Sequence, residues 1–211
     1  MMTAQKVNYQ RELDKIITRL QESGVRKRLL LHSCCGPCSS YVLEYLSQYF
    51  YITVFYYNPN IYPPEEYQTR VKEQERLIGQ MPCLLPVSFQ EGTYEPERFF
   101  AMAKGLEQMP EGGERCFRCY EMRLREAAEY AAEKHFDYFT TTLSISPLKN
   151  AQKLNQIGLK LAKEVGVPYL VSDFKKKNGY KRSVELSAEY GLYRQSYCGC
   201  VYSRGLSGQE T

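Results

Sequence analysis

Seven of the eight cysteines in this 211-residue chain stand in three short groups. The groups are Cys34-Cys35-x-x-Cys38, Cys116-x-x-Cys119 and Cys198-Gly199-Cys200. Thiolates are soft ligands that bind zinc or build iron-sulfur clusters, and neighbouring thiols can also exchange as disulfides. The sequence therefore predicts a site based on cysteine chemistry. The remaining cysteine, Cys83, lies in the apolar stretch 81–87 and is expected to be a small core residue.

The first two cysteine groups have the pattern of a metal site. Four thiolates suit a tetrahedral zinc ion or an iron-sulfur cluster, and spacing alone leaves both open. Structural zinc ligands usually come from two short knuckles close in sequence, whereas these groups lie about 80 residues apart. A fifth cysteine is surplus to a closed four-ligand site and could hold a second metal. His32, two residues before Cys34, is a candidate for tuning that metal through a hydrogen bond.

The third group has two interpretations. Cys198 and Cys200 are separated by one glycine, so they could close a small, strained disulfide of the easily reduced, redox-active kind. Metal ligation by one or both thiols is the alternative. Because Arg194, Tyr197 and Arg204 flank the pair, we expect it to belong to an active site and not to the core.

The elements that must position these cysteines follow an α/β pattern. Apolar, β-branched and aromatic runs alternate with helical stretches, as in βαβ units of a parallel sheet. We predict strands at 28–32, 51–57, 83–88, 138–142 and 168–171, and helices at 39–49, 64–80, 95–104, 117–134 and 150–165. The first cysteine group follows the first strand, at the sheet edge where open α/β folds bind ligands. No glycine-rich phosphate loop occupies that position, which argues against ATP-dependent tRNA thiolation.

The chain before the first strand has its own helical pattern. Its apolar residues recur at intervals of three and four, at Leu13, Ile16, Ile17 and Leu20. We therefore predict a helical extension at 1–27, which does not resemble a secretory signal, followed by a single α/β domain at 28–211. No apolar run approaches the roughly 18 residues of a membrane span. Clustered thiols without a secretory signal favour a cytoplasmic protein.

Positive charge is concentrated near the C-terminus. Residues 175–204 hold seven basic and two acidic side chains, a net charge of +5 within a chain of net charge +4. Five tyrosines are interleaved with these cations. Cations bind phosphates and aromatic faces stack on unpaired bases, so the segment 175–204 is expected to bind RNA with a splayed-out nucleotide. A solvated basic face is the alternative.

Polar side chains also follow other predicted strands. Asn58 and Asn60 come after the second strand, and Ser144 and Ser146 come after the fourth. They could orient a ligand, or they could serve only in turns and helix capping. Asp173 follows the last predicted strand and could act as an acid or as a metal ligand, although a carboxylate that caps a loop is the commoner case.

Five strings of the sequence together carry a family resemblance. They are LLHSCCGPCS (30–39), YYNPNIYPPEEYQTR (56–70), ERCFRCYEMRL (114–124), TTLSISPLKN (141–150) and KKNGYKRSVELSAEYGLYRQSYCGC (176–200). In this order they resemble the cobalamin-independent epoxyqueuosine reductases, the QueH family, over about residues 28–204. The resemblance implies a Rossmann-like parallel sheet flanked by helices, related to the nucleotide α-hydrolases, with a C-terminal cysteine-containing segment. It also implies the last step of queuosine biosynthesis, reduction of epoxyqueuosine to queuosine at the wobble position of tRNA.

The resemblance further implies cofactors and their ligands. It assigns a 4Fe-4S cluster to Cys34, Cys35, Cys116 and Cys119. We assign Cys38 to an additional mononuclear iron. Cys198 and Cys200 match the C-terminal pair of the family, and their role as disulfide, ligand or proton donor stays open. Reduction of an epoxide needs two electrons and two protons, so an unidentified electron donor is required, and a cysteine thiol or Asp173 would provide protons.

These inferences give a defined set of candidate residues. The predicted catalytic residues are Cys38, Asp173, Cys198 and Cys200. The predicted substrate contacts are Asn58, Asn60, Ser144, Ser146, Lys175, Tyr180, Arg182 and Arg194. A zinc-stabilised RNA-binding module and a thiol oxidoreductase are the alternatives, and the second of these would need neither a second cysteine pair nor a basic aromatic segment.

Overall fold

The apolar runs of the sequence form a parallel four-stranded sheet in the computed structural model, which describes residues 7–204. The first six residues of the predicted extension and the last seven of the predicted domain lie outside the described residues. The strands are β1 (Lys27–His32), β2 (Phe50–Tyr56), β3 (Val87–Glu91) and β4 (Tyr138–Thr141), in the order β3-β2-β1-β4. Leu29, Leu30 and Leu31 of the central β1 are all fully buried, because both faces of the sheet are covered.

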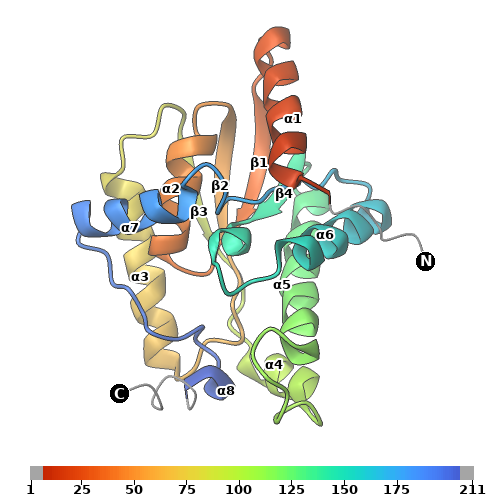
Figure 1. Ribbon diagram of the computed structural model, residues 1–211, viewed down its shortest axis with the longest axis vertical. Helices are drawn as coiled ribbons and strands as arrows, with labels where there is room; N and C mark the ends of the chain where they lie inside the picture. Colours follow the sequence, from red (N-terminus) through yellow and green to blue (C-terminus); the bar gives the residue numbers. More distant parts are fainter. Residues whose placement is uncertain (1–6, 205–211) are drawn as a thin grey trace.

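Helices form a layer on each face of the sheet (Figure 1). On one side α5 (Glu114–Glu133) packs on α6 (Ala151–Val165), and on the other α2 (Gly36–Leu46) packs on α3 (Pro64–Gln80) and α7 (Gly179–Glu189). Successive side chains of β1 point to opposite faces of the sheet. Leu30 packs in the core with α5 and α6, whereas Leu29 and Leu31 pack in the core with α2. The predicted α/β fold with a parallel sheet is therefore confirmed.

The order of the strands creates a switch point beside β1. After β1 the chain builds β2 and β3 on one side, and it then crosses to place β4 on the other side. His32 pairs with Thr141, so both strands end at the same level. The segments that follow them, 33–38 and a short 3-10 helix (Thr142–Ile145), meet at the carboxyl edge, where open α/β sheets bind ligands.

The N-terminal helix α1 (Tyr9–Ser23) packs against the main core. Leu13 and Ile17 are buried with side chains of β1 and α2. Gly24 ends the helix in the left-handed region, at φ +66°, which favours glycine. No helix within residues 7–204 is long and apolar enough to cross a membrane.

Three element predictions differ from the structure. The third strand begins at Val87 and not at residue 83; Pro86, which has no backbone N–H, directly precedes it. The segment 168–171 makes only an isolated bridge, Phe139 to Tyr169, because Ser172 already bonds to Asn155 of α6. The helix α7 and the short helix α8 (Val201–Arg204), both within the basic segment, were not predicted. The predicted helix at 95–104 is confirmed as α4 (Pro96–Ala103).

Candidate functional site

The segment 33–38, here called the cysteine loop, consists of residues 33–35 after β1 and the first turn of α2, and it gathers three thiols. The sulfur atoms of Cys34, Cys35 and Cys38 all lie within 4.8 Å of one another. Within the described part of the chain, no other group of three or more His, Cys, Asp or Glu residues has this geometry. The Tyr56 hydroxyl donates to the Cys34 carbonyl at 3.2 Å and so fixes the loop to the end of β2.

A neutral histidine supports the start of the cysteine loop. His32 is fully buried, and its Nε2 lies 3.1 Å from the Tyr57 carbonyl, which can only accept. Nε2 therefore carries the proton, and Nδ1 accepts from the Thr141 hydroxyl at 2.9 Å. Burial lowers the pKa of His32 to about 3, so the ring stays neutral. Its contacts join the ends of β1, β2 and β4.

Buried hydroxyls and amides hold the rest of the cysteine loop. The Oε1 atom of Gln74 on α3 accepts from the Ser33 hydroxyl at 2.8 Å and from the Ser39 hydroxyl at 2.7 Å. The Asn58 amide donates to the Ser33 carbonyl at 2.8 Å. All four side chains are buried. Because a buried polar group costs free energy when it is unpaired, this network specifies one loop conformation.

The three thiols of the cysteine loop differ in their affinity for protons. Hydrogen bonds from Cys35 and Cys38, aided by the charges of Arg123 and Lys149, hold the pKa of Cys34 well below its usual range. Hydrogen bonding to Cys34 raises the pKa of Cys35 to about 12, and it also raises the pKa of Cys38. The group thus favours a thiolate at Cys34, whereas Cys35 and Cys38 would have to lose their protons on binding a metal.

The second cysteine pair lies in the first turns of α5. The backbone N–H of Gly112 donates to the Cys116 sulfur at 3.3 Å. Cys116 packs against the core cluster that contains Cys34, and Cys119 lies in a smaller buried cluster with Cys200. Burial raises the pKa of Cys116, and it raises that of Cys119 to about 12.

The third cysteine pair is carried by residues 190–200, here called the C-terminal strap, which runs along α3 (Figure 1). Arg76 donates to the carbonyls of Tyr190 and Gly191 at 3.0 and 3.2 Å. Glu73 accepts from the Tyr193 backbone N–H at 2.6 Å. Side chains of one helix thus hold the beginning of the strap.

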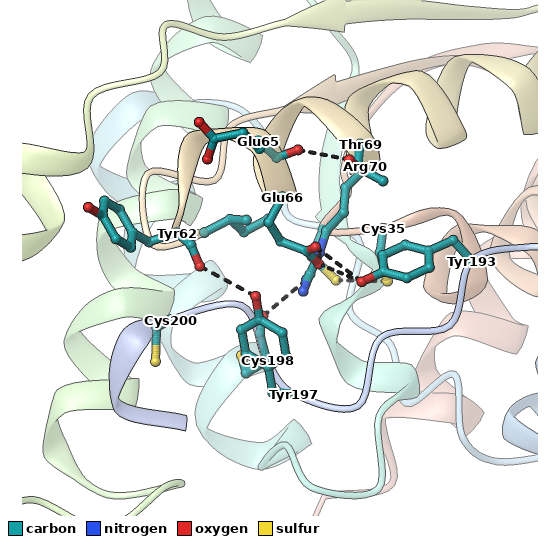
Figure 2. A network of polar contacts seen from close by, with 12 residues as sticks. Cys35, Tyr62, Glu65, Glu66, Thr69, Arg70, Tyr193, Tyr197, Cys198 and Cys200 are labelled. Carbon is teal, nitrogen blue, oxygen red and sulfur yellow. Dashed lines mark hydrogen bonds and ion pairs between the residues drawn. The ribbon is translucent and has the colours of Figure 1, made fainter. Parts of the chain in front are cut away.

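Arg70 of α3 holds the cysteine end of the C-terminal strap. Its Nε donates to Glu66 at 2.7 Å, its Nη1 donates to the Cys198 carbonyl at 3.3 Å, and its guanidinium carbon lies 5.4 Å from the Tyr197 ring centroid. Figure 2 shows the contact between Arg70 and Cys198. It also shows the hydroxyl groups of Tyr193 and Tyr197 directed toward Glu66 and the Tyr62 carbonyl. Gly199 has φ +109°, and a Cβ there would lie 3.0 Å from Arg70 Nη1, so both its conformation and its space favour glycine.

A cavity of about 580 Å³ lies between the cysteine loop and the C-terminal strap. Its wall includes the thiols Cys34, Cys38 and Cys198, the cations Arg123, Lys149 and Arg194, the tyrosines Tyr180 and Tyr197, and Glu111. Lys149 Nζ donates to the Cys198 sulfur at 3.3 Å. Burial alone would lower the pKa of Lys149, but the nearby Cys198, Tyr120 and Cys34 raise it, so the ammonium is charged.

The predicted substrate residues fall into three sets. Ser146, Tyr180 and Arg194 line the cavity. Asn58, Asn60 and Ser144 are buried, and Asn60 has no hydrogen-bond partner for either polar side-chain atom. Lys175 and Arg182 are outside the cavity wall, where they pair with Asp173 at 2.9 Å and with Glu44.

The predicted catalytic residues are divided in a similar way. Cys38 and Cys198 line the cavity, whereas Cys200 is not part of its wall, is buried with Cys119 and donates to Ser203 at 3.6 Å. Asp173 is held by Lys175 and is not part of the cavity wall. All eight cysteines, including the half-buried Cys83 beside the core, are unbridged thiols.

Two buried arginines and a partly buried lysine of the site were not singled out from the sequence. They are Arg70, Arg123 and Lys149, and each lies within one of the five strings that carry the family resemblance. A signal existed for Arg123, which follows Cys119 by four residues and so shares its face of α5. Arg70 and Lys149 had no such signal, because their contacts join segments far apart in sequence.

The parallel sheet, the thiol group at its switch point and the cation-lined cavity define a Rossmann-like protein with a cysteine-based site. Comparison with known proteins makes the class specific. The family model for epoxyqueuosine reductase QueH matches residues 29–205, and the chain belongs to this family of oxidoreductases.

Individual relatives agree with that family over most of the chain. The chain is 46% identical to the epoxyqueuosine reductase QueH of Staphylococcus epidermidis, over 98% of its own length and 89% of the relative's. It is 44% identical to that of Streptococcus pyogenes, over 97% and 81% of the two lengths. The QueH of Thermotoga maritima is 34% identical over 83% of this chain and 89% of its own.

Proposed function

We propose that this protein reduces epoxyqueuosine to queuosine at the wobble position of tRNA, the last step of queuosine biosynthesis. Membership of the QueH family supports the reaction. The structural observation that carries the proposal is the opening of Cys34 and Cys38 onto a cavity that is also lined by cations and tyrosines. The reaction would replace the epoxide with a cyclopentene, consume two electrons and two protons, and release the oxygen as water.

The donor set fits an iron-sulfur cofactor. All candidate ligands are thiols, which select soft metals, and five of them exceed what a closed zinc site needs. The proposed ligands of a 4Fe-4S cluster are Cys34, Cys35, Cys116 and Cys119, with Cys38 for an adjacent mononuclear iron. When bound, these groups would supply electrons and a Lewis acid for the epoxide oxygen.

The protein itself would manage the protons of the reaction. Lys149 and Cys198 both line the cavity, and Nζ lies 3.3 Å from Sγ, so a proton can be held between these atoms. We assign proton donation to Cys198 with Lys149, and not to Asp173, since that carboxylate is paired with Lys175 outside the cavity wall. Cys200 remains the proposed thiol partner of Cys198 in a redox-active pair that an electron donor would reduce.

The tRNA would approach the cavity from the side of the basic segment. Tyr180 is 40% exposed at the cavity and offers a face on which a base can stack. Arg194 lines the same wall and can meet a phosphate or a hydroxyl. Lys175 and Arg182 already have acidic partners, so they would contribute less to phosphate binding than their charge implies.

An anaerobic reconstitution tests the proposal. The protein should turn brown with iron and sulfide, absorb broadly in the visible range, and convert epoxyqueuosine to queuosine in tRNA when a chemical reductant is present. Mass spectrometry of digested nucleosides measures the conversion. A colourless protein with bound zinc would support the RNA-binding module instead, and reduction of a disulfide substrate without any change in tRNA would support a thiol oxidoreductase.

A further inference from the structure

Arg123 on α5 is a buried cation without a counter-ion. Its side chain is fully enclosed, with 1% of its surface exposed. One nitrogen, Nη1, donates to the Asn58 side-chain oxygen at 3.1 Å. Within residues 7–204, the Nε and Nη2 atoms have no hydrogen-bond partner and no carboxylate lies at ion-pair distance. A charge that is buried without a counter-ion destabilises the folded state, so a bound group of opposite charge would offset it.

The other two fully buried arginines are better satisfied, since each has one side-chain nitrogen without a hydrogen-bond partner, Nη2 of Arg70 and Nε of Arg115, where Arg123 has two. Arg70 forms an ion pair with Glu66 at 2.7 Å. Arg115 donates from Nη1 to three backbone carbonyls at 2.6 to 2.9 Å. Arg123 has only one neutral oxygen, although its burial is equal to theirs.

The surroundings of Arg123 are thiols from three separate segments. Burial acts to lower the pKa of Arg123, and the nearby Cys119, Cys198 and Cys34 raise it. Arg123 and Cys34 both line the cavity. Arg123 therefore lies on α5, four residues after Cys119, and lines a cavity whose wall also contains the thiols Cys34 and Cys198.

We infer that Arg123 donates its Nε–H and Nη2–H to the sulfur atoms of the bound iron-sulfur cofactor, and that its charge raises the reduction potential of that cofactor. A cluster held by four thiolates has a net negative charge, which offsets a buried guanidinium. Positive charge and hydrogen bonds to sulfur stabilise the reduced form, because it has one more negative charge. The inference rests on the proposed function, since it requires iron-sulfur ligation.

Redox titration of reconstituted holoprotein tests the inference. At one fixed poised potential we expect Arg123→Gln to lower the ratio of reduced to oxidised cluster at least about tenfold, equivalent to about 59 mV for one electron. Arg123→Lys keeps the positive charge but loses the planar guanidinium with its several N–H donors. The reduction potential of this variant should therefore also fall, but by less than that of Arg123→Gln. The control is Arg125→Gln, which removes an exposed charge from the same helix and should leave the ratio unchanged.

The stability of the metal-free chain provides a second readout. If Arg123 serves the cofactor, Arg123→Gln should not lower the melting temperature of metal-free protein, because it removes an unpaired buried charge, but it should lower that of the holoprotein. A similar loss in both forms would make Arg123 merely structural and overturn the inference. So would an Arg123→Gln or Arg123→Lys holoprotein with the wild-type potential.

The tests separate this inference from the proposed function. If the variants shift the potential while wild-type protein leaves epoxyqueuosine unreduced, the function fails and the inference stands. If wild-type protein reduces epoxyqueuosine and the Arg123 variants have the wild-type reduction potential, only the inference fails. Wild-type protein that binds no cluster overturns both.

Discussion

The cysteine loop and the C-terminal strap both bring thiols to one cavity, but they are held in different ways. The cysteine loop is held by buried groups, including Gln74, Asn58 and His32, from the ends of the sheet and from α3. The strap is held by side chains of α3 that reach its backbone, and several of its residues are exposed. We infer that the cysteine loop is a preformed binding site for the proposed cofactor, and that the strap adds a reactive thiol, Cys198, to that site.

The largest expected effect comes from a substitution in the cysteine loop. Cys34→Ala removes the thiol whose pKa is held low by its neighbours, so iron content and tRNA reduction should both fall to background. Iron analysis and nucleoside mass spectrometry measure the two losses. Cys83→Ala, which changes a half-buried thiol beside the core, should affect neither. Full iron content in Cys34→Ala would break the distinction between the loop and the strap.

A second substitution sharpens the comparison from the side of the strap. Cys198→Ala should lower the rate of epoxyqueuosine reduction about a hundredfold, the usual contribution of a general acid, while iron content stays at the wild-type value. Single-turnover assays with prereduced protein separate proton donation from electron supply. Loss of iron in this variant would instead make Cys198 a ligand.

The buried network under the loop should control stability. Gln74→Ala removes two buried hydrogen bonds, and the hydroxyls of Ser33 and Ser39 keep only the Cys35 carbonyl and each other as partners, so the free energy of unfolding should fall by about 2 kcal/mol. Urea unfolding of metal-free protein measures the change. Gln68→Ala at an exposed position of the same helix is the control, and its effect should stay within about 0.5 kcal/mol. Equal effects would mean that the network does not stabilise the loop.

The smallest effect separates two glycines of the strap. Gly191 and Gly199 both have positive φ, so alanine at either should cost about 1 kcal/mol. Only at Gly199 would a Cβ crowd Arg70 and Ile61, at 3.0 and 2.9 Å, whereas nothing lies within 4 Å at Gly191. Gly199→Ala should therefore also slow tRNA reduction, by about tenfold for 1.4 kcal/mol of misplacement, and Gly191→Ala should not. Equal rates would show that Arg70 does not set the position of the strap.

The sequence predicted the region around the cysteine loop better than the basic C-terminal region that contains the strap. The parallel sheet and the place of the cysteine loop follow from local patterns, because a buried strand and the loop after it are read from adjacent residues. The roles of Lys175 and Arg182 were not evident from the net charge of their segment. Glu44, the partner of Arg182, lies on α2 and is brought close by the packing of α7 on α2. Asp173, the partner of Lys175, is two residues away in sequence but lies just outside the segment 175–204.

The strand at 168–171 shows the same limit within the fold. Its apolar residues are buried as predicted, but Asn155 binds the backbone of Ser172, and the segment leaves the sheet after one bridge. The hydrophobic pattern specifies burial, and a single long-range hydrogen bond helps to decide whether a ladder forms. Tertiary contacts of this kind also placed Arg70 and Lys149 in the site.

The C-terminal strap has a consequence for biosynthesis. The cysteine loop and the α5 pair leave the ribosome long before residues 190–200, which form one wall of the cavity. During that interval the cavity lacks the wall that the strap provides, so the thiols of the cysteine loop are less enclosed than in the finished chain. If the proposed cofactor is inserted before the strap docks, the rate of translation between α5 and the strap would set the time for that insertion.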